Sequence, residues 1–180
     1  RKAGKGSMQM SGYQILEEDM KPSVLLDTSF FIRLLNDEDP LHNNAKEYFK
    51  FFLEDGIVLK VSTISIAEYC VRGKIDELPL KNLQIVPFNL DQAIKTGEFG
   101  GAIFEENKRS EEKLTPRAII PNDSKLFEQA DLDQSITYFV TSDSRSKATY
   151  GNLKKRIKPK FEILDISRPY HEAFGILDLH

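Results

Sequence analysis

The sequence predicts an α/β protein of three layers, α/β/α, in which helices cover both faces of a central parallel sheet of about five strands. Short apolar runs of strand length recur along the chain, and most are followed by segments whose apolar residues are spaced three and four apart. The chain has 180 residues, enough for one domain with a sizeable core, and no linker divides it into halves.

The first predicted strand and helix lie on either side of an acidic residue. Residues 23–26 form a short apolar run that stops at Asp27. Thr28 or Ser29 is expected to cap the helix that follows, because small hydroxyl side chains accept hydrogen bonds from the first helical N–H groups. The second helix is expected to begin at the next Asp-Pro pair and to end at Gly56, since proline suits a first helical turn and glycine the position after the last.

The remaining elements alternate in the same way. Apolar and β-branched runs predict four more strands, at 57–61, 83–88, 137–141 and 161–166. Helical spacing predicts further helices, at 64–72, 89–104, 121–130 and 145–157. We assign residues 23–167 to the domain. Residues 1–10, in which Met8 follows a Gly-Lys-Gly-Ser stretch, are interpreted as a disordered tag remnant, and 168–180 as a C-terminal tail without assigned structure.

Composition narrows the class of function. A formal net charge of −3 excludes a uniformly basic coat for nucleic acid but not a local basic patch. The single cysteine, Cys70, excludes an internal disulfide framework and is typical of a reducing compartment. No apolar run approaches the roughly 18–20 residues of a membrane helix, and no apolar core follows the basic N-terminus as in a secretory signal. We therefore expect a cytoplasmic protein without membrane contact.

Four acidic residues occupy comparable places relative to these elements. Asp27 closes the first strand, and Asp143 follows the fourth by two residues. Glu68 lies one turn into the helix after the second strand, and Asp123 stands at the start of a later helix. Because right-handed crossovers bring the carboxyl ends of parallel strands to one edge, we expect the four carboxylates to meet there. Taken singly, each is explained as well by a helix cap or a turn.

A cluster of this kind needs a cation. At an effective dielectric constant of 20, each close pair of carboxylates costs about 4 kcal/mol, so the cluster either binds a cation or takes up protons. Oxygen ligands without histidine or cysteine nearby are typical of Mg²⁺ or Mn²⁺. Because such ions activate water and offset the charge of a phosphoryl displacement, the pattern predicts metal-dependent phosphodiester chemistry.

The order of four short motifs resembles the PIN domain, a nuclease fold of about this length. In chain order the motifs are Leu25-Leu-Asp27-Thr-Ser-Phe, Ser65-Ile-Ala-Glu68, Pro121-Asn-Asp123 and Val140-Thr-Ser-Asp143. The resemblance covers roughly residues 23–167. The chain departs from the family pattern where the helix after Asp123 reads Ser-Lys-Leu-Phe-Glu-Gln in place of small apolar residues.

The resemblance implies a PIN-like fold and a metal-dependent endoribonuclease, and the family includes the toxins of VapBC-type toxin–antitoxin pairs. It implies catalytic and metal-binding roles, with Mg²⁺ or Mn²⁺ as the cofactor, for the acidic residues Asp27, Glu68, Asp123 and Asp143. Thr28 would orient the first carboxylate, and Ser142 or Thr141 would act likewise near Asp143. The resemblance further implies an RNA substrate, a homodimer and, for a toxin, an antitoxin protein that inserts a segment over the acidic edge.

A basic stretch follows the last of these acids. Between Ser144 and Phe161 the chain has seven basic residues and no acidic one. Arg145 and Lys147 lie nearest to the predicted site, so we expect them to contact RNA phosphates, the alternative being a solvated helix face. Two other classes of function remain open: a PIN-like module that binds RNA or protein without catalysis, and another Mg²⁺-dependent phosphotransfer domain.

Overall fold

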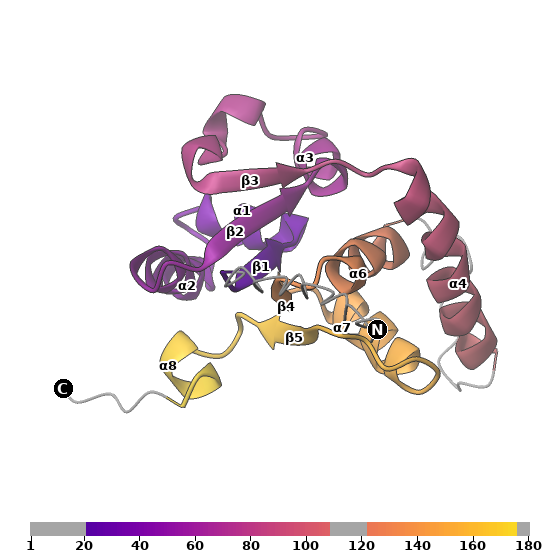
Figure 1. Ribbon diagram of the computed structural model, residues 1–180. Helices are drawn as coiled ribbons and strands as arrows, with labels where there is room; N and C mark the ends of the chain where they lie inside the picture. The colour runs from indigo at the N-terminus through magenta and orange to yellow at the C-terminus, as the bar shows by residue number, and fades with distance from the viewer. Residues whose placement is uncertain (1–20, 109–121, 176–180) are drawn as a thin grey trace, which may run out of the picture.

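The sheet has five strands, which are β1 (Ser23–Leu26), β2 (Val58–Ser62), β3 (Leu83–Val86), β4 (Ile136–Thr141) and β5 (Glu162–Asp165). They lie in the order β3-β2-β1-β4-β5 (Figure 1). Every neighbouring pair is parallel, as the sequence predicts. The computed structural model describes residues 21–108 and 122–175. The predicted tag remnant at 1–10 therefore lies outside the described residues.

Helices cover both faces of this sheet. The helices of one face are α1 (Thr28–Leu34), α2 (His42–Glu54) and α8 (Tyr170–Ala173), and α3 (Thr63–Tyr69) packs beside α1. Those of the other face are α4 (Leu90–Asn107), α6 (Asp123–Leu132) and α7 (Ser144–Lys154) (Figure 1). This arrangement confirms the predicted three-layer α/β/α fold. Within the described residues, no helix combines the length and the apolar character needed to cross a membrane.

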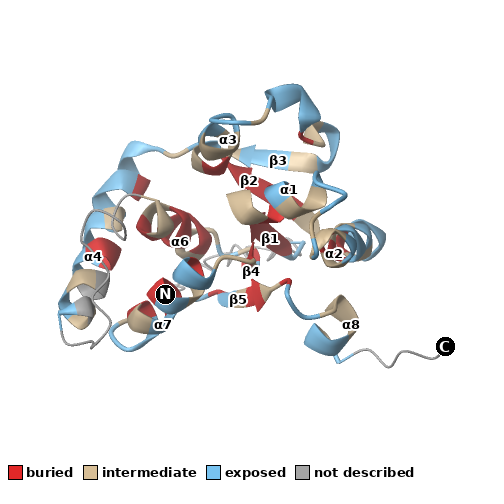
Figure 2. Ribbon diagram, turned by 180° about the vertical axis from the view of Figure 1, so that it is seen from behind, coloured by how far each residue is buried: buried red, intermediate tan, exposed pale blue. Residues whose placement is uncertain are grey.

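The central strand shows why the two layers form. Along β1, Val24 and Leu26 point into the core beneath α1 and α2, whereas Leu25 points into the core beneath α6 and α7. All three are completely buried, and Figure 2 shows buried residues along β1 and the strands next to it. Burying one such side chain stabilises a fold by about 1.5–3 kcal/mol. A strand that is apolar on both sides therefore takes the middle of the sheet.

Polar residues at the strand ends begin the helices. Ser62 caps α3 and accepts a hydrogen bond from the N–H of Ile64 at 3.0 Å. The predicted cap of α1 was wrong by one residue, because the cap is Asp27 and not Thr28 or Ser29. Asp27 still has the extended backbone of the strand, so the first helical residue is the one after it.

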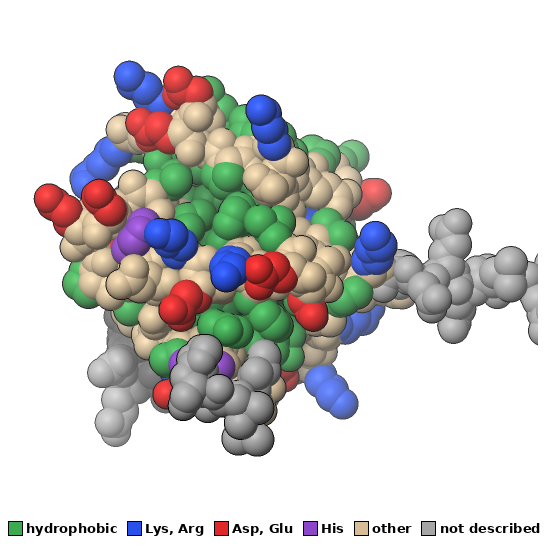
Figure 3. All heavy atoms as spheres, turned by 90° about the vertical axis from the view of Figure 1, so that its left-hand side faces the viewer, with side chains coloured by type: hydrophobic (Ala, Val, Ile, Leu, Met, Phe, Trp, Pro, Cys, Tyr) green, Lys and Arg blue, Asp and Glu red, His purple; other side chains and the backbone are tan. Residues whose placement is uncertain are grey.

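Residues 168–175 of the predicted C-terminal tail are described by the structure, and residues 176–180 lie outside the described residues. From residue 168 onward, where the sequence suggests no element, the chain forms α8 and packs aromatic rings against α2. The ring centroid of Phe51 lies 4.8 Å from that of Phe174 and 5.2 Å from that of Tyr170. Figure 3 shows the side of the molecule on which α2 lies, with hydrophobic side chains on both sides of a row of charged ones. Phe51 of α2 is thus partly covered by the segment that contains α8.

Glu128 of α6 is a buried carboxyl group without a hydrogen-bonding partner among the described residues. Its residue exposure is 0%, and neither carboxyl oxygen forms a hydrogen bond. Burial raises the pKa of Glu128 to about 7, while the charge of Lys95 on α4 lowers it and that of Asp131 raises it. The folded protein therefore holds a proton that the unfolded chain releases at lower pH.

The protein should lose stability from this group as the pH rises. The pKa of Glu128 is about 7 in the folded protein against an ordinary 4.5, so its favourable contribution is present below pH 4.5 and is lost between pH 4.5 and 7. Glu128→Gln lacks the titrating group and has no such contribution to lose. Between pH 5 and pH 8 the free energy of unfolding of the wild type should therefore fall by up to about 3 kcal/mol relative to that of Glu128→Gln. Urea unfolding of both proteins at the two pH values measures the difference. A difference that does not change with pH would contradict the assignment.

Candidate functional site

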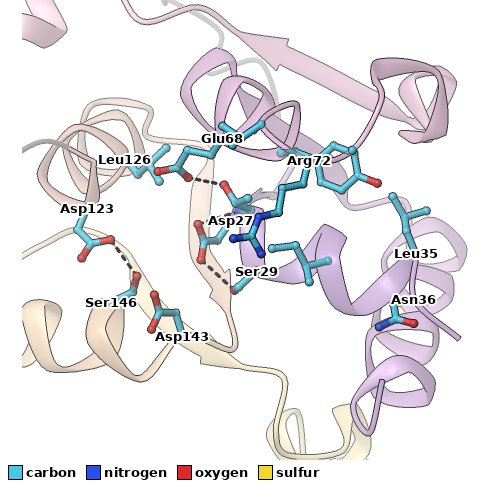
Figure 4. A pocket seen from close by; sticks show the side chains of 15 residues that line it. Asp27, Ser29, Leu35, Asn36, Glu68, Arg72, Asp123, Leu126, Asp143 and Ser146 are labelled. Carbon is cyan, nitrogen blue, oxygen red and sulfur yellow. Dashed lines mark hydrogen bonds between the residues drawn. The ribbon is translucent and has the colours of Figure 1, made fainter. Parts of the chain in front are cut away.

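The segments that follow β1, β2 and β4 line a cavity of about 660 Å³. All four acidic residues singled out in the sequence are among its lining residues, namely Asp27, Glu68, Asp123 and Asp143. They come from four separate segments, which meet because the strands are parallel and end at the same edge (Figure 4). The structure thus places the four carboxylates on one cavity, and their catalytic role remains a prediction.

Asp27 is held most tightly of the four. Its residue exposure is 6%, and its carboxylate accepts hydrogen bonds from the N–H of Thr28 at 2.7 Å and from the hydroxyls of Ser29 at 2.9 Å and Thr141 at 2.8 Å. Burial raises the pKa of Asp27 to about 6, although these hydrogen bonds lower it, and the charge of Asp123 adds to the rise. The carboxylate is therefore costly to keep charged until a cation lies beside it.

The orienting hydroxyls differ in part from those implied by the resemblance. The Thr28 hydroxyl donates to Oε2 of Glu68, so it positions Glu68 and not Asp27. Thr141 takes the part that the resemblance left to either Ser142 or Thr141, because its oxygen also accepts the N–H of Asp143 at 3.0 Å. Ser142 donates its backbone N–H to the Ser29 hydroxyl at 3.0 Å, and its own hydroxyl accepts a hydrogen bond from the guanidinium of Arg33 at 3.4 Å.

Each of the other three acids has a partner of its own. Glu68 also accepts a hydrogen bond from the side-chain amide of Asn122. Asp123 accepts one from the hydroxyl of Ser146 at 2.9 Å, and burial raises the pKa of Asp123, with the charges of Asp143 and Glu68 adding to the rise. Asp143 caps α7 by accepting the N–H of Arg145 at 2.8 Å.

The donor set fits a hard divalent cation, although the acids are not gathered around one point. Within residues 21–108 and 122–175, no three His, Cys, Asp or Glu side chains form a group that could hold a metal ion. Carboxylate and hydroxyl oxygens line the cavity nevertheless, and burial raises the pKa of two of the carboxyls. A cation that binds here must therefore compete with the hydroxyl and amide groups that now hold the acids.

The predicted phosphate-binding residues are not equivalent in the structure. Arg145 is exposed in the first turn of α7. The ammonium group of Lys147 instead forms an ion pair with Asp165 at 2.5 Å. Further along the basic stretch, Lys154 pairs with Glu162 and Arg156 with Glu106. Much of the charge of this stretch is thus neutralised by acids from other segments.

Sequence reasoning missed several residues at this cavity. Ser146 could have been predicted from its position three residues after Asp143, nearly one helical turn along α7. Its buried side chain faces the cavity. Asn122, which does not line the cavity but donates a hydrogen bond to Glu68, appeared in the sequence analysis only as part of a motif. Arg72, which follows α3, also lines the cavity and points into it (Figure 4). Nothing in its sequence neighbourhood marked it, because the direction of a side chain after a helix depends on the turn.

Comparisons with known proteins support the fold. No family model matches the sequence, and no curated protein matches it in sequence. A chain from the DNA-bound VapBC complex of Salmonella typhimurium is 18% identical with a TM-score of 0.50, and the match covers 82% of this chain and 99% of that one. A chain from VapBC2 of Rickettsia felis, bound to a DNA fragment from their promoter, is 16% identical with a TM-score of 0.52, covering 79% and 98%. This chain therefore has the PIN-like fold of these structures.

Divalent cations should stabilise the protein through the acidic cavity. At 100 times its dissociation constant, a bound ion adds about 2.7 kcal/mol to the free energy of unfolding, which raises Tm by several degrees. Titration of Mn²⁺ and Mg²⁺ should raise the Tm of the wild type but not that of Asp27→Asn. Glu54→Gln removes an exposed carboxylate of α2 that pairs with Lys50, and it should keep the full rise. No rise for the wild type at millimolar metal would contradict a metal site.

Proposed function

We propose that this chain is an endoribonuclease that depends on Mg²⁺ or Mn²⁺ and acts as the toxin of a toxin–antitoxin pair. The observation that carries the proposal is the cavity at the carboxyl edge of the parallel sheet, on which four acids from four segments converge. The fold shared with chains of two VapBC complexes supports it. The hard oxygen donors of the cavity suit these two cations.

The chain's own residues divide the work. The carboxylates of Asp27, Asp123 and Asp143, with Glu68 beside them, would hold the cation, which when bound supplies an ionised water and offsets the negative charge of the phosphate. Ser29 and Thr141 keep the carboxylate of Asp27 directed towards the cavity. Such preorientation matters because catalysis of phosphoryl transfer consists mainly of positioning and charge stabilisation.

Two kinds of protein partner belong to the proposal. An antitoxin would cover the cavity, and the two matched structures are both VapBC complexes bound to DNA. Exposed apolar residues beside the acids provide a surface for such a partner, as Val71 is 79% and Ile32 48% exposed and both line the cavity. A homodimer would use another apolar surface, for which the side carrying α2 is a candidate (Figure 3).

A binding module without catalysis is the second candidate. It is favoured by one observation, that the described acids form no group able to hold a metal ion. The two candidates predict the same affinity for RNA and opposite results in a cleavage assay, so one experiment separates them.

RNA cleavage should depend on the acids of the cavity. Asp27→Asn and Asp143→Asn should each reduce cleavage of a single-stranded RNA in Mn²⁺ by at least about 100-fold, because each removes a charge that holds the cation. Circular dichroism should show both variants folded. Glu54→Gln, whose side chain is exposed on α2, is the matched control and should cleave like the wild type. Equal cleavage by Asp27→Asn and the wild type would exclude the proposed site.

The two basic residues at the start of α7 should contribute unequally to RNA binding. In an Asp27→Asn background that does not cleave, Arg145→Ala should weaken binding of single-stranded RNA and lower the slope of log affinity against log salt by about one. Lys147→Ala should have a smaller effect, because its charge is already offset by Asp165. Fluorescence anisotropy over a range of salt concentrations measures both. An equal loss in the two variants would show that the ion pair opens when RNA binds.

A further inference from the structure

One guanidinium group reaches into the cavity that the four acidic residues line. Arg72 is the basic side chain among the described residues that line the cavity. In Figure 4 it extends from the turn after α3 towards the part of the cavity where Asp27 and Ser29 lie. Within the part of the chain that the structure describes, its side chain forms no ion pair and no hydrogen bond. Its N–H donors are therefore available to a ligand.

The turn that carries Arg72 is fixed by short-range contacts. The backbone N–H groups of Arg72 and Gly73 both donate to the carbonyl of Tyr69, at 3.2 and 2.9 Å. The ring of Tyr69 lies over Gly73 so closely that a Cβ there would be 2.4 Å from it, so a side chain at this position would displace the ring. The Tyr69 hydroxyl donates to Oε2 of Glu77 at 2.8 Å, and this closes the turn. The base of the Arg72 side chain is thus held in place.

We infer that Arg72 binds the phosphate group that is cleaved in the cavity. A guanidinium is planar and presents parallel N–H donors, which match two oxygens of a phosphate, whereas a lysine ammonium offers only a point charge. Arg72 reaches the cavity from α3, whereas Asp123 and Asp143 lie on the α6 and α7 side, so a phosphate can lie between the two groups. The inference rests on the proposed function, and it adds the residue that recognises the substrate's phosphate.

The role in catalysis follows from the same geometry. Attack by water adds negative charge to the oxygens of the phosphate in the transition state. A guanidinium that is already in place strengthens its interaction as that charge grows, without reorganising. Arg72 therefore acts on kcat as well as on affinity. It is also the charge that allows an anionic strand to approach four carboxylates.

An alternative role for Arg72 makes the opposite prediction. A guanidinium inside an acidic cavity can serve as an internal counter-ion that takes the place of a metal. Removing such a counter-ion strengthens the binding of Mn²⁺ and speeds cleavage. Removing a phosphate-binding residue slows cleavage, whatever small rise in the affinity for Mn²⁺ follows from the loss of a positive charge.

Binding and kinetics on Arg72 variants test the inference. In an Asp143→Asn background, Arg72→Ala should weaken binding of a fluorescent single-stranded RNA roughly 10- to 100-fold, while Arg156→Ala, at the far end of α7, should have little effect. In the otherwise wild-type chain, Arg72→Lys should lower kcat by about 100-fold or more, with a much smaller rise in KM. Thermal melts with Mn²⁺ give the metal affinity of each variant, and those without metal show that it is folded.

The outcomes separate the two proposals. Unchanged RNA binding by Arg72→Ala, or faster cleavage with tighter Mn²⁺ binding, would overturn the role of Arg72. A wild-type chain that binds RNA through Arg72 and cleaves none would instead overturn the proposed nuclease and leave Arg72 as a phosphate-binding residue.

Discussion

The burial of Asp27 at the end of the central strand is the constraint on which the cavity depends. β1 is buried on both sides, so the residue that follows it begins inside the protein before the chain turns outward. A carboxylate in that place is tolerated because three donors from Thr28, Ser29 and Thr141 reach it. Two of these donors lie in α1 and one ends β4, so the same contacts that satisfy Asp27 join helix and sheet.

Hydroxyl and amide groups also donate hydrogen bonds to other acids of the cavity. Glu68 is held by Thr28 and Asn122, and Asp123 is held by Ser146. These hydrogen bonds stabilise the charged forms of the acids, which offsets part of the mutual repulsion of the four carboxylates. Because each acid is held by its own partner, the described acids do not surround a single point. Their oxygen donors nevertheless suit a cation.

Much of the fold and part of the site follow from sequence pattern. The parallel sheet and its three layers follow from the alternation of apolar runs with helical segments, whereas the sequence alone leaves the strand order open. The convergence of Asp27 and Asp143 follows from the parallel topology. The features that the sequence pattern does not predict depend on the direction of the backbone at single residues. The cap of α1 falls on Asp27 because the chain is still extended there. The position of α8 depends on the packing of its aromatic rings against Phe51, which the sequence does not indicate.

The clustering of basic residues in the sequence does not predict where positive charge lies on the folded protein. The seven basic residues between 144 and 161 suggest a strongly positive surface, yet Lys147, Lys154 and Arg156 each pair with an acid that lies outside this stretch. An isolated arginine that follows α3 instead brings its charge into the cavity. The potential that a phosphate meets is set by the charges left unpaired after folding, because a paired charge contributes little beyond its partner. Under the proposed function, the attraction of the RNA substrate therefore depends on the turn after α3 as much as on α7.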